Sequence, residues 1–297
     1  MIFAYDTVAS GEGANIRTWI GFKHFEYVVS DAIREYLTAS GVDARQLIID
    51  GGAFEVVASR VALTSVIELG DRLTVRIVEL IRVAADRLSA IVEIDNLRSA
   101  QRALKGRYQI LLTAPADDAG RFAPVLETLA EGPLAVAAKP RGGTLSGPET
   151  PAAADVFAHE WVVPYYYCER SEVLSYRGYV RTVETVVDEY LAHVGLAIPG
   201  LLAERAWIPV VAKYSFEILA PAPMGVRVRT FFKIEDVVGD AVFNASWATF
   251  AEQPAGWVCT ARGEIQHGYA ISRGAAAGSL ARLDEATIKA LTRGEPR

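Results

Sequence analysis

The sequence has few cysteines, few histidines and no long hydrophobic run, and each shortage argues against a class of protein. Its 297 residues include two cysteines, Cys168 and Cys259, and four histidines. Two cysteines cannot build a disulfide framework or a cysteine-rich metal site, so we expect no bound metal and reduced thiols. No apolar run reaches the roughly 18 residues of a membrane helix, and the first residues lack the pattern of a signal peptide. We therefore expect a soluble, cytoplasmic protein that does not bind membranes.

Positive charge is also scarce. The chain has 30 Lys and Arg against 36 Asp and Glu, which gives a net charge of −6. This balance disfavours binding to nucleic acid or to an anionic surface. Apolar residues, in contrast, make up 51% of the chain, enough to form the core of one large domain or of two ordinary ones.

Two segments of the chain resemble each other, SDAIREYLTASGV at Ser30–Val42 and ETVVDEYLAHVGL at Glu184–Leu196. The matched positions are Tyr36 with Tyr190, Gly41 with Gly195, and Val56-Val57-Ala58 with Val210-Val211-Ala212. All three matches have one offset, since 190 − 36 = 154. Matches that share an offset over about 25 residues indicate an internal duplication.

The spacing of apolar residues is first helical and then extended in each half. Helical spacing predicts helices over Phe25–Ser40 and Tyr179–Val194, each with a glycine just after its end. Runs rich in Val, Ile, Phe and Trp then predict strands. These are Phe54–Leu63, Leu73–Ile81, Leu88–Ile94 and Tyr108–Thr113 in the first half, and Trp207–Leu219, Val226–Ile234, Ala241–Phe250 and Trp257–Gln266 in the second. Short strands are expected before the helices, at Phe3–Val8 and Val162–Cys168.

The predicted fold class is α+β, with two long helices each wrapped by an antiparallel sheet. The units are predicted at 1–114 and 160–274, joined by a linker at 115–159 that is rich in Ala, Gly and Pro, and followed by a tail at 275–297. The linker is expected to contain a short helix near Val125–Ala130, and the tail another at Asp284–Thr292. One such unit exposes a sheet edge and needs a partner. Two fused copies related by a pseudo-twofold supply it, so a monomer is feasible and a homodimer is an alternative.

The run Tyr165–Leu191, YYYCERSEVLSYRGYVRTVETVVDEYL, resembles the entry to the helix of hotdog-fold acyl-CoA thioesterases of the hydroxybenzoyl-CoA type. The whole chain thus resembles a double hotdog. Aligning the family's helix tyrosine with Tyr179 places its catalytic aspartate on Glu169 and its helix acid on Glu184. The chain departs from the family pattern, because the loop reads Glu-Arg-Ser-Glu instead of Asp-x-x-Gly and Gly178 replaces an asparagine. The resemblance supports the fold more strongly than the reaction.

The resemblance implies a site for an acyl thioester carried by coenzyme A or by the phosphopantetheine of an acyl carrier protein, with no further cofactor. Glu169 would activate water or attack the thioester, and an N–H near Gly178 would polarise the carbonyl. Glu172 can exchange roles with Glu169, and Tyr176 can contribute a hydroxyl from the loop. The alternative for Glu184 is a structural hydrogen-bond acceptor or an exposed charge, and the alternative for Tyr179 is a residue of the hydrophobic core.

The first half matches the family less well. The offset carries Glu169 onto Asn15 and Tyr179 onto Phe25, which His24 precedes. An asparagine cannot act as a base, but it can donate a hydrogen bond to a thioester carbonyl. His24 would be a base, a donor or a capping contact of the helix. This asymmetry predicts one working acid and one binding or degenerate site.

Thioester hydrolysis is the leading hypothesis, with two alternatives. Double-hotdog acyltransferase/decarboxylases or dehydratases of natural-product pathways would use Tyr176, Tyr166 or His24. A non-catalytic acyl-binding protein would fit the departures from the family loop. Arg227 and Arg229 share a face of one strand, and they are either simply exposed or attract coenzyme A phosphates or the acidic surface of a carrier protein.

Overall fold

The computed structural model describes residues 2–49, 52–84, 86–113, 156–169, 171–254 and 256–293. It forms two compact units. The first comprises Met1–Arg141 with Ser175–Arg177, and the second comprises Gly142–Leu174 with Gly178–Arg297. The predicted linker, with its helix near Val125–Ala130, lies outside the described residues except for positions 156–159.

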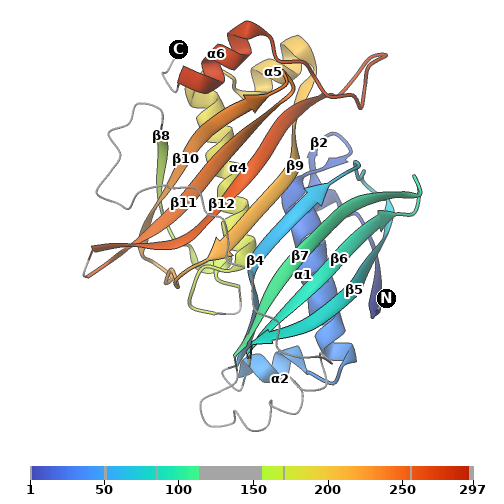
Figure 1. The fold of residues 1–297 in the computed structure, drawn as a ribbon, viewed down its shortest axis with the longest axis vertical. Helices are drawn as coiled ribbons and strands as arrows, with labels where there is room; N and C mark the ends of the chain where they lie inside the picture. Colours follow the sequence, from blue (N-terminus) through green and yellow to red (C-terminus); the bar gives the residue numbers. More distant parts are fainter. Residues whose placement is uncertain are drawn as a thin grey trace. The chain divides into compact units, whose positions relative to one another are not determined.

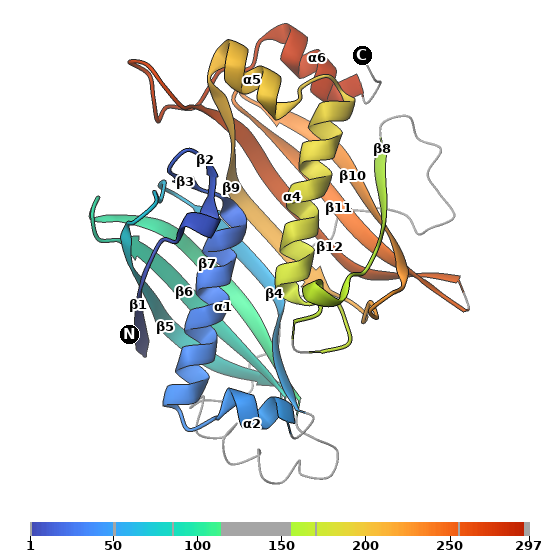
Figure 2. The ribbon, with the colours of Figure 1, turned by 180° about the vertical axis from the view of Figure 1, so that it is seen from behind.

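In the first unit, a long helix lies across one face of an antiparallel sheet (Figures 1 and 2). The segments around the helix are β1 (Phe3–Val8), η1 (Gly11–Gly13), β2 (Ala14–Ile16), β3 (Trp19–Ile20), the helix α1 itself (Phe22–Ala39) and α2 (Ala44–Ile49). The strands that follow are β4 (Ala53–Leu63), β5 (Arg72–Ala84), β6 (Arg87–Asn96) and β7 (Gln101–Thr113). The strand order is β1-β5-β6-β7-β4.

The second unit repeats this plan, with α4 lying across its sheet (Figure 2). Its elements begin with β8 (Val156–Val162), η2 (Tyr165–Tyr167), α4 (Tyr176–His193) and α5 (Ile198–Arg205). They continue with β9 (Trp207–Ile218), β10 (Arg227–Val238), β11 (Val242–Gln253), β12 (Gly256–Ile271) and α6 (Glu285–Arg293). The strand order is β9-β12-β11-β10-β8. The first two residues of α4, Tyr176 and Arg177, are grouped with the first unit.

The two units match in packing as well as in element order. In the first, Phe3 packs edge-on against Tyr36 with 5.7 Å between ring centroids. In the second, Phe157 packs against Tyr190 in the same way at 5.9 Å. Phe157 follows Phe3, and Tyr190 follows Tyr36, by the same offset of 154 residues, since 157 − 3 = 154 and 190 − 36 = 154. The equivalence of Tyr36 and Tyr190, and with it the α+β duplication, is confirmed.

Several details of the predicted elements were wrong. The long helices begin three residues earlier than predicted, at Phe22 and Tyr176. The strand before α4 is Val156–Val162 instead of Val162–Cys168, because Tyr165–Tyr167 turn into η2. The helices α2 and α5 were not predicted, since segments of six and eight residues are too short to show a clear period.

One of the three sequence matches was a coincidence. Val56 pairs with Ile110 in the first sheet, and Val211 pairs with His267 in the second. In both strands pairing resumes only after one bulged residue, which directly follows Val56 in the first unit and Val211 in the second. Val211, and not Val210, is therefore the equivalent of Val56. The offset is therefore 155 in the strands, since 211 − 56 = 155.

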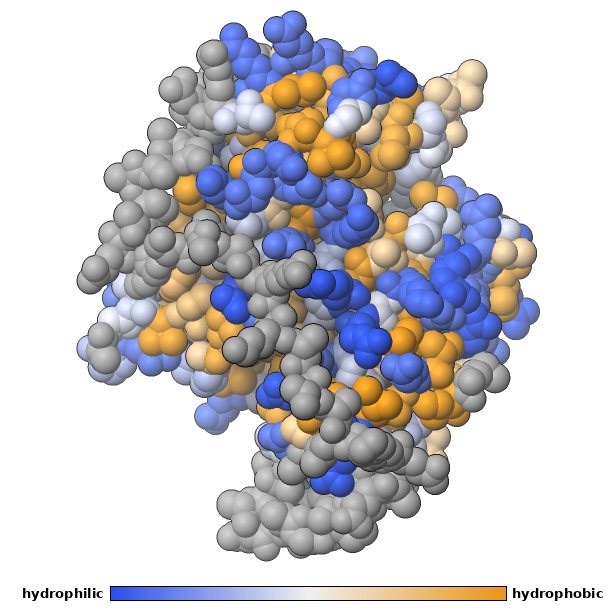
Figure 3. Space-filling model, viewed as in Figure 1, coloured by the Kyte–Doolittle hydropathy of each residue, from blue (hydrophilic) through white to orange (hydrophobic). Residues whose placement is uncertain are grey.

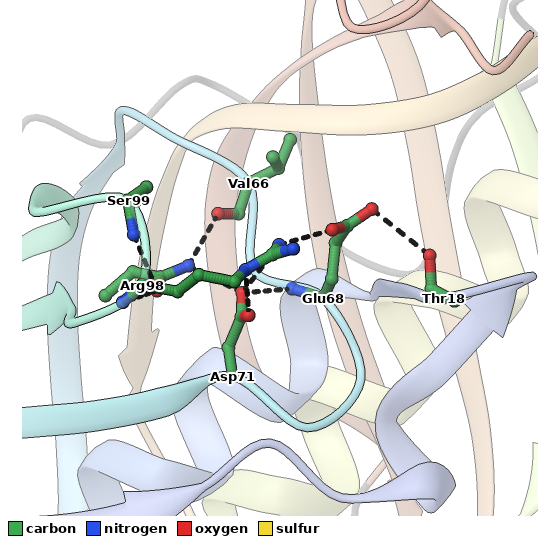
Figure 4. Close-up of polar contacts among 7 residues, drawn as sticks. Thr18, Val66, Glu68, Asp71, Arg98 and Ser99 are labelled. Atoms are coloured by element: carbon green, nitrogen blue, oxygen red, sulfur yellow. Dashed lines mark hydrogen bonds and ion pairs between the residues drawn. The ribbon is translucent and has the colours of Figure 1, made fainter.

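A buried polar cluster ties two turns of the first unit together (Figure 4). Asp71, which is 3% exposed, accepts hydrogen bonds from the Glu68 N–H at 2.8 Å and from the Asn96 amide at 2.6 Å. It also pairs with Arg98 at 2.5 Å. Glu68 in turn accepts a hydrogen bond from the Thr18 hydroxyl at 3.2 Å. The cluster thus joins the turn before β5 to the turn between β6 and β7.

Candidate active site

A glutamate lies inside the core of the first unit. On α1, Val29, Ile33 and Leu37 recur at helical spacing and are 0–1% exposed, so they define the face that packs on the sheet. Glu26 continues this face toward the start of the helix and is itself 0% exposed. A carboxylate in such a position is stable only if it is hydrogen-bonded or neutral.

Two tyrosines bind one oxygen of this carboxyl group. Tyr176 Oη donates to Glu26 Oε2 at 2.5 Å, and Tyr108 Oη donates to the same oxygen at 3.1 Å. Ser59 Oγ lies 3.1 Å from Tyr176 Oη. The groups come from α1, β4, β7 and the first residue of α4. Glu26 Oε1 is buried and has no hydrogen-bond partner among the described residues.

The cluster shifts the acidity of its members. Burial raises the pKa of Glu26 to about 7, and the hydrogen bonds from Tyr176 and Tyr108 oppose this rise. Burial and the nearby Glu26 charge hold the pKa of Tyr108 well above its usual range. A carboxyl group that titrates near neutrality can give or accept a proton under ordinary conditions. Tyr108 therefore stays protonated and acts as a donor.

The predicted loop acids lie in the second unit on the segment that leads into α4. Glu169 is exposed and has a left-handed backbone, with φ of 48°. That conformation costs a non-glycine residue about 1 kcal/mol. Glu172 is also exposed, and its carbonyl accepts the Met224 N–H at 2.7 Å. Both carboxylates therefore face solvent before the helix begins.

The predicted residues on α4 itself are more enclosed. Tyr179 is 1% exposed and packs on Phe216 at a centroid distance of 5.5 Å, and burial raises the pKa of its phenol. Gly178 lies so close to Tyr167 that an added Cβ would meet the Tyr167 carbonyl oxygen at 2.6 Å, so a larger residue would displace the backbone. Glu184 is half-buried.

In the first unit, Asn15 and His24 flank the start of α1. A Cβ added to Gly21 would meet the side-chain amide nitrogen of Asn15 at 2.0 Å. Asn15 Oδ1 accepts a hydrogen bond from Lys23 Nζ at 3.1 Å. His24 is buried, and its ring packs against Tyr27 at 5.0 Å. The carboxamide of Asn15 thus lies directly over the residue that precedes the helix. The roles predicted for both residues stay predictions.

The sequence interpretation of Tyr176 as a loop hydroxyl was wrong. Tyr176 is the first residue of α4, is 0% exposed and contacts Glu26. Sequence reasoning also missed Glu26, Tyr108 and Ser59. The available signal was an acidic residue on the apolar face of a predicted helix, but the partners on β4 and β7 are brought close only by the folded sheet.

Arg227 and Arg229 are paired within their own sheet. Arg227 donates two hydrogen bonds to Glu252, at 2.9 and 2.7 Å, and Arg229 donates to Glu160 at 2.6 Å. Both guanidinium groups also lie over Trp257, at 5.7 and 4.7 Å from its ring centroid. In the view of Figure 1, hydrophobic residues on the visible surface form several areas separated by hydrophilic ones (Figure 3). Both arginines thus have acidic partners in the sheet, and the binding role considered for them stays a prediction.

The described residues contain neither a metal-binding cluster nor a single helix that could span a membrane. No group of three or more His, Cys, Asp or Glu side chains there is arranged to hold a metal ion. No single helix in this part of the chain is long and apolar enough to cross a membrane, and only α4 and α5 together, bent by 68°, meet the length and composition test. His159 of β8 pairs with Glu189 of α4 at 2.5 Å.

Comparison with known proteins identifies the fold. No protein-family model matches the sequence, and a search of curated proteins finds no significant match. Solved structures do match over most of their length. A putative oleoyl thioesterase from Lactobacillus plantarum has a TM-score of 0.65 at 9% identity, covering 90% of this chain and 95% of that chain. The chain is a double hotdog.

Two other solved structures agree with this assignment. An acyl-ACP thioesterase from Bacteroides thetaiotaomicron has a TM-score of 0.60 at 10% identity, covering 89% of this chain and 97% of that chain. The 12:0-ACP thioesterase from Umbellularia californica has a TM-score of 0.62 at 11% identity, covering 90% and 94%. At such identities the likeness establishes the double-hotdog fold, whereas the reaction must be argued from this chain's own residues.

Proposed function

We propose that the protein hydrolyses an acyl thioester whose thiol carrier is coenzyme A or an acyl carrier protein. The double-hotdog fold supports this class of reaction, because the full-length neighbours named above are thioesterases. The observation that carries the proposal is the position of Glu169, an exposed carboxylate in a left-handed conformation on the segment before α4. Non-glycine residues in this conformation are enriched at functional sites.

Hydrolysis of a thioester requires an activated water or a nucleophile, and donors for the oxyanion. In the proposed mechanism, Glu169 takes a proton from a water molecule as the water oxygen bonds to the thioester carbonyl carbon. A backbone N–H at the start of α4, near Gly178, would stabilise the negative oxygen, assisted by the helix dipole. Breakage of the carbon–sulfur bond then releases the thiol, which takes up the proton, and the free acid.

In the first unit, Asn15 replaces this acid at the position 154 residues earlier. Its carboxamide can donate a hydrogen bond but cannot act as a base at neutral pH. We therefore assign hydrolysis to the Glu169 loop and only binding to the Asn15 loop. Release of thiol from a panel of acyl-CoA thioesters of different chain length tests the reaction directly.

The decisive variant is Glu169→Gln, which keeps the shape and hydrogen bonding of the side chain but removes its basicity. It should lower kcat by about 100-fold, the scale for loss of a general base, with little change in KM. Glu172→Gln is the matched control, because Glu172 is exposed on the same loop. Loss of activity in Glu172→Gln alone would transfer the role to that residue. Full activity in both variants would refute the carboxylate mechanism, and binding without thiol release would indicate an acyl-binding protein.

A further inference from the structure

The proposed hydrolysis uses none of the side chains around Glu26, although this cluster is the most deeply buried polar group on α1. Packing does not require it. The equivalent position on α4 is Val180, since 180 − 26 = 154, and Val180 is equally buried at 0% exposure. An apolar residue thus satisfies the same place in the fold. The carboxyl group in the first unit calls for a separate explanation.

The hydrogen bonding of Glu26 is one-sided. Oε2 accepts bonds from both tyrosines, whereas Oε1 is buried without a partner among the described residues. Buried polar atoms nearly always have a partner, and an unsatisfied one costs about 1–3 kcal/mol. Arg177, which follows Tyr176 on α4, donates to Asp31 and to the Tyr27 carbonyl. Oε1 therefore offers a hydrogen bond to a group from outside the protein.

The two ionisation states of Glu26 limit which chemical group can bind Oε1. Glu26 titrates near neutral pH, so both states are populated. The ionised Oε1 needs a donor. In the neutral acid the proton belongs on Oε1, because Oε2 already accepts two hydrogen bonds, and Oε1–H then needs an acceptor. An amide N–H or a ketone satisfies one state only, whereas a hydroxyl group satisfies both.

We propose that Glu26 binds a hydroxyl group of the acyl moiety, so that the preferred substrates are hydroxyacyl thioesters. This rests on the proposed thioesterase function. Glu26 is fully buried on α1, between the buried residues Phe22 and Val29 of the same helix face, which suits a hydrocarbon chain that carries one polar group and does not suit the charged part of coenzyme A. Sites built to bond a substrate hydroxyl discriminate strongly against the analogue that lacks it.

The test compares acyl-CoA thioesters of one chain length that are unsubstituted, hydroxylated at carbon 3, or hydroxylated at the terminal carbon. The wild type should show a kcat/KM at least about 10-fold higher for one hydroxylated substrate. Glu26→Val, which installs the residue found in the second unit, should abolish that preference, so that kcat/KM becomes equal for the hydroxylated and unsubstituted substrates. Tyr108→Phe is the matched control. It removes a donor to Oε2 but leaves Oε1, so the preference should persist.

If Glu26→Val does not fold, Glu26→Val with Tyr108→Phe removes both partners of a buried hydrogen bond and serves in its place. The absence of a hydroxyl preference in the wild type, or its persistence in the valine variant, would overturn the proposal. Measuring Kd for the same thioesters by calorimetry distinguishes failure of the hydroxyl-binding proposal from failure of the proposed hydrolysis. A hydroxyl preference in Kd that Glu26→Val removes would support the site even if no thiol were released.

Discussion

The two units share one backbone plan but bury different chemistry. The first encloses Glu26 and the Asp71–Asn96 pair. The equivalent positions in the second are apolar: Val180 for Glu26, Ile265 for Tyr108, Val226 for Asp71 and Ala251 for Asn96. Because the second unit folds on the same plan without these groups, neither polar cluster is a requirement of the fold. Each cluster therefore has a role in the first unit other than defining the fold.

The distribution of exposed acids is reversed. In the second unit, Glu169 and Glu172 face solvent before α4, whereas the first unit has Asn15 at the position of Glu169. A duplicated fold can thus divide its tasks, with an exposed acid in one copy and a buried acid in the other. The two buried clusters also differ in how completely their polar atoms are hydrogen-bonded. Three polar groups, the Glu68 N–H, the Asn96 amide and the Arg98 guanidinium, all bond to Asp71, which suits a structural role, while Glu26 keeps one oxygen for a ligand.

The largest expected effect comes from moving the buried acid into the wrong copy. Val180→Glu would place a carboxyl group in the second unit where Ile265 stands in place of Tyr108 and cannot donate. An uncompensated buried charge should lower the free energy of unfolding at neutral pH by about 4 kcal/mol. Urea unfolding measures the change. Val180→Gln is the control for size, and equal stability of the two variants would mean that charge is irrelevant at this position.

The next effect concerns the pH dependence of Glu26 itself. Its pKa is about 7 in the folded state against an ordinary value of 4.5, so the folded state holds its proton more tightly than the unfolded state. The neutral form is fully stabilising below about pH 4.5, and the contribution is lost as pH rises toward 7. Over this window the wild type should lose about 3 kcal/mol of stability relative to Glu26→Gln.

Urea unfolding of both proteins at pH 5 and pH 8 gives the difference, in which the contributions of all other groups cancel. We expect Glu26→Gln to gain on the wild type as the pH rises. Parallel pH profiles for the two proteins would show that Glu26 does not titrate in this range. Tyr108→Phe sharpens the measurement, because removing a donor to the ionised carboxyl should steepen the wild-type slope.

The sequence predicted the duplication because its signals are local. Tyr36 and Tyr190 repeat within helices, and helical and extended spacing are both visible along the chain. The Glu26 cluster could not be predicted, because Ser59, Tyr108 and Tyr176 are far apart in sequence and meet only through strand pairing and helix packing. Tyr176 was placed in a loop because the apolar helical spacing becomes clear only from Tyr179 onward. Ser175, a residue type favoured at the N-cap, directly precedes α4 and was the signal for its earlier start.

The smallest effect tests whether the Asp71 cluster is structural. Asp71→Val copies the second unit and leaves the Glu68 N–H and the Asn96 amide without their acceptor. It should lower the free energy of unfolding by about 2 kcal/mol, the cost of unsatisfied buried donors. Asn96→Ala should also destabilise the protein, because the side-chain Oδ1 of Asn96 accepts the Arg98 backbone N–H at 2.9 Å.

The double variant, Asp71→Val with Asn96→Ala, decides the matter, because it reproduces the apolar pair Val226 and Ala251 of the second unit. Once Asn96 is gone, its amide no longer lacks an acceptor, so the double variant should cost about 1 kcal/mol less than the sum of the single variants. Urea unfolding of all four proteins measures this coupling. Additive losses would mean that Asp71 and Asn96 act independently, and that the second unit owes its stability at this turn to other contacts.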